Sequence, residues 1–192
     1  MADTLTTNQA HTTQNTPGTR TLWYADPAHT DVSFSAKHMM IATVKGRFTK
    51  VEASLELDEN DFTNSTVEAR IDSTSLYTGV DYRDNHLRSA DFILAEQYPH
   101  ITFQSTRIER DGDHFDVVGN LTIRDVTREV VLHTSDEGRG GDPWGGQRAA
   151  FSATTKIDRR EFGLTWNQAL ETGGVVVGND IKISLEVQAV KA

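Results

Sequence analysis

The feature of this sequence that most constrains its fold is a repeated alternation of apolar and polar residues. In DVSFSAKH, residues 31–38, the side chains of Val32, Phe34 and Ala36 share one face, while charged and hydroxyl side chains share the other. Successive side chains of a β-strand point to opposite faces, so this period of two predicts a strand. One apolar face and one polar face are typical of a half-buried antiparallel strand.

The same alternation recurs along the chain at intervals marked by turn residues. It is found in residues 50–58, 66–72, 100–105, 115–123, 130–132, 151–157 and 181–187. Asp111 and Gly112 lie between two apolar runs and predict a β-hairpin, and a break falls near Asp125. About eight long strands of this kind favour an antiparallel barrel or sandwich. An eight-stranded barrel has an interior that side chains just fill or that holds one small ligand.

Length and charge limit the domain count and the class of partner. The 192 residues are expected to form one domain, residues 21–192, preceded by a disordered tail. That tail, residues 1–20, contains seven threonines and almost nothing apolar to pack. The net charge of -9, with 19 Lys and Arg dispersed among 28 Asp and Glu, argues against a nucleic-acid partner.

The sequence also bears on compartment, redox chemistry and metals. The first twenty residues lack the pattern of a signal peptide, and no apolar stretch reaches 18 residues, so we expect a soluble, cytoplasmic protein without a transmembrane segment. The chain has no cysteine, which excludes thiolate nucleophiles and thiolate metal sites. Its seven histidines show no metal-ligand spacing, so no metal is predicted.

The stretch DYRDNHLRSADF, residues 81–92, is the segment whose composition most suggests an active site. Asp84, His86 and Asp91 could serve as base, acid and orienting group. Helical spacing argues against this, because His86 lies two positions from Asp84 and points to a different face. We therefore expect a structural role, with contact to the polar end of a ligand as the alternative.

The segment 81–94 is predicted to be a short helix. Asp81 is expected to be its N-cap, and Asp84 is expected to pair with Arg88 at the i, i+4 spacing. The apolar stripe of the helix would consist of Leu87, Ala90 and Leu94.

Three further features carry structural and functional interpretations. His38 shares the apolar face of its strand and needs a polar partner, either a neighbouring strand or loop or a bound ligand. The glycine-rich residues 137–146 lack a phosphate-loop ending and are expected to be a long flexible hairpin connection. Residues 161–183 predict a long loop over a hydrophobic opening, with Trp166 as a core plug or a pocket wall.

Several motifs, taken in their order, resemble those of one known family. They are WYADPAHTDVSFSAKHM (23–39), VKGRF (44–48), DYRDNHLRSADF (81–92), YPHITFQS (98–105), GNLTIRDVTREVVL (119–132), FGLTWN and GGVVVGNDIKI. The family is that of the YceI-like proteins, described as polyisoprenoid-binding barrels of lipocalin-like shape. The resemblance covers nearly everything after residue 20. The chain departs from it at Asp125, where similar sequences often carry glycine, and in lacking the signal peptide of secreted members.

The resemblance implies an all-β fold, an extended eight-stranded antiparallel β-barrel with one or two short helices. It also implies that the apolar lumen holds a long isoprenoid or fatty-acyl chain, that the protein is a homodimer, and that it has no catalytic motif. The residues add modest support, because small side chains on apolar faces leave space along a lumen. These are Ala36, Ala53, Ala69, Gly119 and Ala153.

The leading hypothesis is therefore non-catalytic binding, storage or transport of a long-chain apolar lipid, such as a polyisoprenoid, an isoprenoid quinone or a fatty-acyl compound, without a further cofactor. The lumen would be walled by Phe34, Phe48, Val67, Leu87, Phe92, Phe103, Leu121, Trp166 and Ile183. The lipid head group would contact His38, Arg83 and Asn167. Two alternatives stay open: an isomerase or cyclase acting on such a lipid through His38, and a structural interaction module with a filled core.

Overall fold

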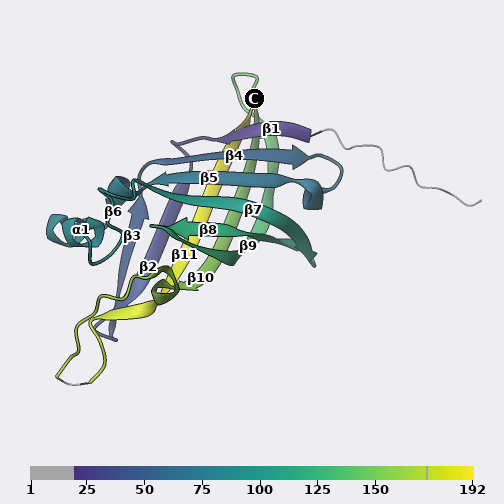
Figure 1. Cartoon of the computed structure of the whole chain (residues 1–192). Helices are drawn as coiled ribbons and strands as arrows, with labels where there is room; N and C mark the ends of the chain where they lie inside the picture. The colour runs from purple at the N-terminus through teal and green to yellow at the C-terminus, as the bar shows by residue number, and fades with distance from the viewer. Residues whose placement is uncertain (1–19, 172) are drawn as a thin grey trace, which may run out of the picture.

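The barrel closes because its last strand pairs with its first. The computed structural model describes residues 20–171 and 173–192. In order around the barrel the strands are β1 (Arg20–Ala25), β4 (Val51–Asp58), β5 (Thr66–Asp72), β7 (His100–Asp111), β8 (His114–Ile123), β9 (Val126–Gly141), β10 (Gln147–Asp158) and β11 (Val177–Lys191). β11 pairs back onto β1, so eight antiparallel strands form a closed ring (Figure 1). The predicted fold class is confirmed.

Most of the remaining elements lie toward one end of this ring. They are the strands β2 (Asp31–His38), β3 (Ala42–Phe48) and β6 (Leu76–Tyr77), the helix α1 (Asp81–Arg88), and the single-turn helices η1 (Phe62–Asn64), η2 (Ser73–Ser75) and η3 (Arg159–Phe162). Only η1 among them lies at the opposite end, beyond β4. The predicted tail, residues 1–20, lies outside the described residues except for Arg20, with which β1 begins.

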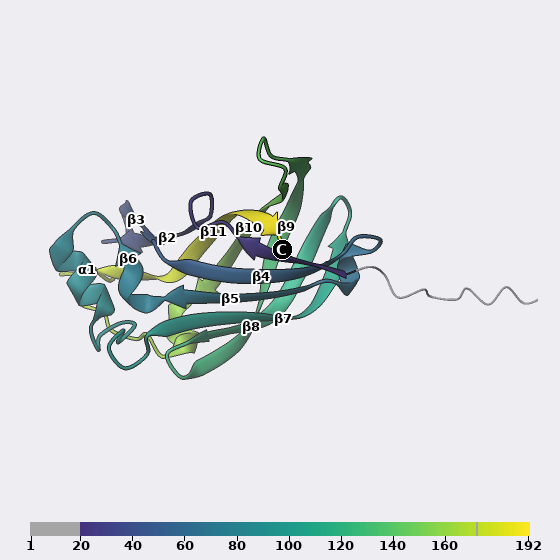
Figure 2. The same ribbon diagram turned by 90° about the horizontal axis from the view of Figure 1, so that it is seen from above.

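Three positions of the ring are each filled by two strands in succession. β11 pairs with β1 near Lys191 and with β2 around Ile183, so β1 and β2 follow one another along the same edge. β4 follows β3 in the same direction after two connecting residues, so these two strands share the second position. β5 and β6 share the third position in the same way, and β6 pairs with β3. The barrel is thereby extended on this side toward α1, as Figure 2 shows.

The strand predictions agree closely with the structure where alternation is regular. Residues 31–38 and 66–72 coincide with β2 and β5. The hairpin predicted at Asp111 joins β7 to β8 through Gly112, whose φ of 59° suits glycine. β1, β3 and β6 were not predicted as strands, because they are short or, like β3, interrupted by a glycine.

The segment around α1 differs from its prediction in three respects. The helix begins at Asp81 after Val80, so Asp81 is not its N-cap, and it ends at Arg88, before two of the three predicted stripe residues. Asp84 does not pair with Arg88: its buried carboxylate accepts hydrogen bonds from the backbone N–H and hydroxyl of Thr78. Arg88 instead donates to the carbonyl of Leu76. Both side chains therefore tie the helix to the segment that precedes it.

The glycine-rich segment also contains more strand than expected. Residues 137–141 belong to β9, so the connection to β10 comprises only residues 142–146. Asp142 organises this turn, because its Oδ1 accepts from the N–H groups of Trp144 (3.0 Å) and Gly146 (2.8 Å). The predicted hairpin connection is present but shorter than expected, because glycines can pair in a ladder when the neighbouring strand is long enough.

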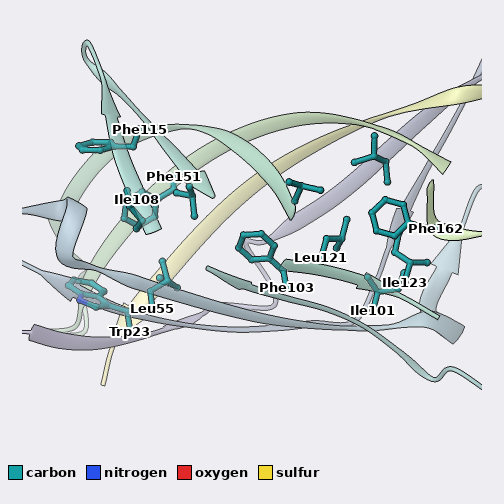
Figure 3. Packing of buried hydrophobic residues seen from close by; sticks show 14 of the residues in the cluster. Trp23, Leu55, Ile101, Phe103, Ile108, Phe115, Leu121, Ile123, Phe151 and Phe162 are labelled. Atoms are coloured by element: carbon teal, nitrogen blue, oxygen red, sulfur yellow. The ribbon is translucent and has the colours of Figure 1, made fainter. Parts of the chain in front are cut away.

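The apolar core is densest in two regions along the barrel axis. At one end the ring of Phe62, from η1, lies 4.5 Å from Phe115 and 5.7 Å from Phe151 between ring centroids. Toward the other end of β8, Leu121 and Ile123 belong to the same core. Figure 3 shows the labelled side chains in two such groups, with Phe115 and Phe151 in one and Leu121 and Ile123 in the other.

Two inward glycines make room for phenylalanine rings. A Cβ built at Gly119 would lie 2.5 Å from Cζ of Phe103 on the neighbouring strand, and one built at Gly46 would lie 2.5 Å from Cζ of Phe34. Such cross-strand covering of a glycine by an aromatic ring pins the register of a sheet. Gly119 therefore does not leave free space in the lumen, contrary to the expectation from its small size.

A charged network joins the strands on which closure depends. Nη1 of Arg148, on β10, donates to Asp26 (2.7 Å), just after β1, and to Gln188 of β11 (2.8 Å), while its Nε donates to Asp142 (3.1 Å). The hydrogen bond from Arg148, with a smaller contribution from His29, lowers the pKa of the Asp26 carboxyl from 3.8 to about 2.

We expect Gly119→Ala to destabilise the protein by about 1–3 kcal/mol, because the added methyl group has no room beside Phe103 and the Gln104 carbonyl. The control is Gly140→Ala, where nothing lies within 4 Å of the added Cβ. Urea unfolding measures both free energies, and equal stabilities of the two variants would contradict the tight packing at Gly119.

We expect Asp26→Asn to lower the melting temperature at neutral pH. The pKa of Asp26 is lower in the folded protein than the usual 3.8, so the stabilisation is present above about pH 4 and is lost as the pH falls toward 2. The difference in melting temperature between wild type and variant should shrink over that range. Glu96→Gln, which removes an exposed carboxylate, should show no such trend.

Candidate functional site

The inward face of the barrel carries apolar side chains that are only half-buried. They pack against the core yet retain solvent-accessible surface; Leu87 belongs to α1, and the others lie on strands: Phe34, Phe48, Val67, Ala69, Ile71, Leu132, Ile181 and Ile183. A side chain of a paired strand stays accessible only where nothing packs over it. These nine residues, which we call the half-buried wall, therefore carry apolar surface that the described side chains do not cover.

The half-buried wall is concentrated on one side of the lumen. Ala53 and Ala69 face each other across β4 and β5, and Phe34 faces Ile183 across β2 and β11. All four are half-buried, whereas the inward residues of β8 are buried throughout. The small inward residues Ala36, Ala53 and Ala69 are thus half-buried, while Ala153, like Gly119, is buried.

An aromatic cluster closes over the end of the barrel at α1. The ring of His86 lies edge-on to Trp166 and Phe92, with centroid distances of 4.7 and 5.1 Å, and Phe92 lies 5.3 Å from Trp166. Nε2 of His86 is 2.9 Å from Oδ2 of Asp91. We call His86, Phe92 and Trp166 the mouth cluster. Sequence patterns could not predict that His86 lies beside Trp166, because eighty positions separate the two residues along the chain.

Trp166 is held by a buried arginine. The guanidinium of Arg159, in η3, donates to the carbonyls of Leu164, Trp166 (2.9 Å) and Gly178 (3.0 Å). Burial lowers the pKa of Arg159 below its usual range, although a guanidinium remains charged at neutral pH. Arg159 therefore ties together the two ends of residues 163–176, the segment between η3 and β11. The long loop predicted over residues 161–183 is shorter than expected, because residues 161–162 belong to η3 and β11 begins at Val177.

The three predicted head-group residues occupy different environments. Arg83 donates from Nε and Nη2 to the hydroxyl (2.7 Å) and carbonyl (2.9 Å) of Thr78. Asn167 donates to the carbonyl of Val177 (2.7 Å) and accepts from its N–H (3.0 Å). His38 is half-buried at the end of β2, and no residue within 20–171 or 173–192 hydrogen-bonds to its ring. Of the three, His38 is therefore the residue whose side chain makes no hydrogen bond to the described part of the protein.

The nine predicted lumen residues fall into three groups. Phe34, Phe48, Val67, Leu87 and Ile183 belong to the half-buried wall. Phe103 and Leu121 are buried in the core, and Phe92 and Trp166 belong to the mouth cluster, where Trp166 is half-buried. Their contact with a ligand stays a prediction.

A separate hollow lies on the outer face of the barrel. It measures about 960 Å³ and crosses β9, β10, β11, β2 and β3. Most of its lining side chains point away from the lumen, among them Lys45, Lys156, Lys182, Ser35 and Glu129. Charged and hydroxyl groups line it together with apolar residues such as Val131, so this hollow offers both polar and apolar surface.

The described parts of the chain contain no helix that is long and apolar enough to cross a membrane. Over residues 20–171 and 173–192, no three His, Asp or Glu side chains gather as a possible metal site.

We expect Arg159→Leu to destabilise the protein by about 3 kcal/mol, since several buried carbonyls would lose their donor. Amide hydrogen exchange should accelerate mainly in residues 163–177. Arg160→Leu is the matched control, because Arg160 is an exposed neighbour that pairs with Asp158. Unchanged exchange in residues 163–177 would contradict the role of Arg159 as the anchor of this segment.

Comparison with known sequences finds a family that spans nearly the whole described chain. The model of the YceI-like domain matches residues 23–189. A UPF0312 protein of Staphylococcus aureus (strain bovine RF122 / ET3-1) is 37% identical over 164 residues, which cover 85% of this chain and 94% of that protein. The UPF0312 protein of strain N315 is 36% identical over the same length.

Comparison with solved structures finds the same barrel in three bacteria. A YCEI protein of Campylobacter jejuni has a TM-score of 0.69 at 30% identity, covering 81% of this chain and 90% of that one. BcnA of Burkholderia cenocepacia has a TM-score of 0.75 at 23% identity, covering 85% and 98%. A polyisoprenoid-binding domain of Saccharophagus degradans, implicated in plant cell wall breakdown, has a TM-score of 0.62 at 14% identity, covering 88% and 98%. The last two likenesses show the fold alone.

Proposed function

Because the chain belongs to the YceI-like domain family, whose model matches residues 23–189, we propose that it binds a long-chain apolar lipid in the barrel lumen without transforming it. The ligand would be a polyisoprenoid, an isoprenoid quinone or a fatty-acyl compound, held for storage or transport. The half-buried wall carries this proposal, since it offers apolar surface that the protein's own side chains leave uncovered. The polyisoprenoid-binding domain of Saccharophagus degradans, with the same fold, gives further support.

The chemistry of the wall matches a hydrocarbon chain. Each buried CH2 group contributes about 0.8 kcal/mol, so one isoprene unit contributes roughly 4 kcal/mol before the cost of ordering the chain. At roughly 0.3 kcal/mol per atom, a tail of about forty carbons would bind with on the order of 12 kcal/mol, near nanomolar affinity. Affinity would thus come from the tail, and few polar groups are needed.

Selection of the head group would fall to the mouth. His38 is the best candidate, because it is half-buried at the end of β2 and no described residue hydrogen-bonds to it. Arg83 and Asn167 could contribute only through the polar atoms that their bonds to Thr78 and Val177 leave over. The predicted homodimer and cytoplasmic location belong to this proposal, and sedimentation velocity and cell fractionation would test them.

We expect Ala69→Phe to weaken lipid binding strongly, because the added ring would cover the inward surface at Ala69 and at its cross-strand partner Ala53. Thr102→Phe adds the same ring to the exposed outer face of β7 and should bind like wild type. Calorimetric titration with geranylgeraniol and with palmitic acid would measure affinity, and mass spectrometry of the purified protein would detect retained lipid.

The expected result is at least a tenfold loss of affinity in Ala69→Phe alone, with melting curves confirming that both variants fold. A wild-type protein that retains no lipid and binds neither probe would overturn the proposal. Equal losses in the two variants would show that the binding surface is not the lumen.

A further inference from the structure

The hairpin between β2 and β3 has side chains that do not suit its backbone. The N–H of Ile41 donates to the carbonyl of His38 (3.2 Å), and Met39 and Met40 have φ values of 49° and 63°. Two successive positive φ values define a type I′ turn, for which Asn-Gly is the preferred pair. Methionine is strained in this conformation, and strain of this kind is retained mainly where a side chain has a function.

The side chains at this turn are apolar and face solvent. Met39, Met40 and Ile41 are 44%, 55% and 83% exposed, and we call these three residues the apolar tip. The tip is backed by the segment before β11: the N–H of Met39 donates to the carbonyl of Val176 (2.8 Å), and Gly174 lies against Met40. β11 begins beside His38, so the tip lies at the end of the barrel that carries α1 and the mouth cluster (Figure 1).

The outer face beside the tip carries a row of lysines, although the protein has a net charge of -9. Lys156 faces Lys182 across β10 and β11, Lys182 faces Ser35, and Ser35 faces Lys45, so three lysines lie in one row across four strands. Lys37 lies on the same outward face, two residues before the tip. Like charges directly opposite one another destabilise a sheet unless an anion offsets them.

Few acids neutralise this row. Lys156 pairs with Asp180 (3.2 Å), whereas no Asp or Glu in the described part of the chain forms an ion pair with Lys45 or Lys182. The acids nearby are Asp158 and Asp180, which face each other across β10 and β11, and Glu129 and Glu161, which line the same hollow. Glu171 lies on the segment that backs the tip. Lys37, Lys45 and Lys182 form no ion pair within residues 20–171 and 173–192, so these three cations beside the tip are available to an external anion.

We propose that the apolar tip, with Lys37, Lys45 and Lys182, docks the protein on an anionic lipid bilayer. The tip would enter the interface while the lysines contact lipid phosphates. This inference rests on the proposed function, because docking would bring the mouth of the lumen to the membrane in which long apolar chains dissolve.

The dimensions of the hairpin fit such a contact. At ~3.3 Å per residue, Lys37 lies roughly 7 Å from Met39 along the strand and Lys45 roughly 13 Å from Ile41. Amphipathic segments at membranes bury their apolar face by roughly 5–10 Å. With the tip at that depth, Lys37 would reach the head groups, and Lys45 would lie within about one Debye length of the charged surface.

Vesicle co-sedimentation of the full chain, without added ligand, tests the proposal. We expect binding to vesicles of phosphatidylcholine and phosphatidylglycerol, and at least tenfold weaker binding to phosphatidylcholine alone or at high salt. The variant Met39→Asn/Met40→Gly/Ile41→Thr installs the preferred turn residues, so it should be as stable as wild type or more so. It should nevertheless lose binding at least tenfold, which a purely structural role of these residues would not produce.

Two further variants sharpen the test. Lys45→Gln/Lys182→Gln should weaken binding to the anionic vesicles about tenfold. Trp144→Ser removes a side chain that is 85% exposed at the opposite end of β10 and should leave binding unchanged. Retained binding in the tip variant, or loss in Trp144→Ser, would overturn the proposal. So would a change of oligomeric state in the tip variant, since the tip would then contact a second copy.

The outcome is independent of lipid uptake. Ala69→Phe, which fills the lumen, should still dock on anionic vesicles. A protein that docks but retains no lipid and binds neither probe would overturn the proposed function alone, and a protein that binds lipid but does not dock would overturn the membrane contact alone.

Discussion

The pairing of β11 with β1 is the constraint on which the rest of this structure depends. β11 is long enough to pair with β10 along one edge and with β2 and then β1 along the other. This closure removes the open edges at which a sheet would otherwise pair with other chains. It also turns every inward side chain toward a single interior. The network of Arg148, Asp26 and Asp142 lies beside this pairing and adds charged hydrogen bonds to it.

The side chains of the interior created by closure are unevenly buried, and the proposed lipid binding rests on that difference. Phe62, Phe115 and Phe151 pack one end of the barrel, which stabilises the fold. The half-buried wall on β2, β5 and β11 leaves apolar surface uncovered. The mouth cluster, the apolar tip and the row of lysines lie toward the end that carries α1. Covering this apolar surface would stabilise the fold but leave no room for a ligand, so under the proposed function its exposure is a stability cost that accompanies binding.

Much of the fold could be predicted because alternation is a local property. The bounds of β2 and β5 and the hairpin at Gly112 follow from periodicity and turn residues alone. The errors have a common origin in distant contacts. Asp84 turns to Thr78 and not to Arg88, because a buried carboxylate takes the donors that the fold brings to it. Gly119, expected to leave space, is covered by Phe103 from the neighbouring strand.

The sequence by itself determined the class of fold, the strand faces and the apolar character of the interior, since each depends on the order of side chains along the chain. Only the tertiary structure decided which inward residues stay accessible, that His86 meets Trp166, and that Lys156, Lys182 and Lys45 form one row. The physical reason is that accessibility, ring contacts and charge neighbours depend on distances between strands, and closure of the barrel sets these distances.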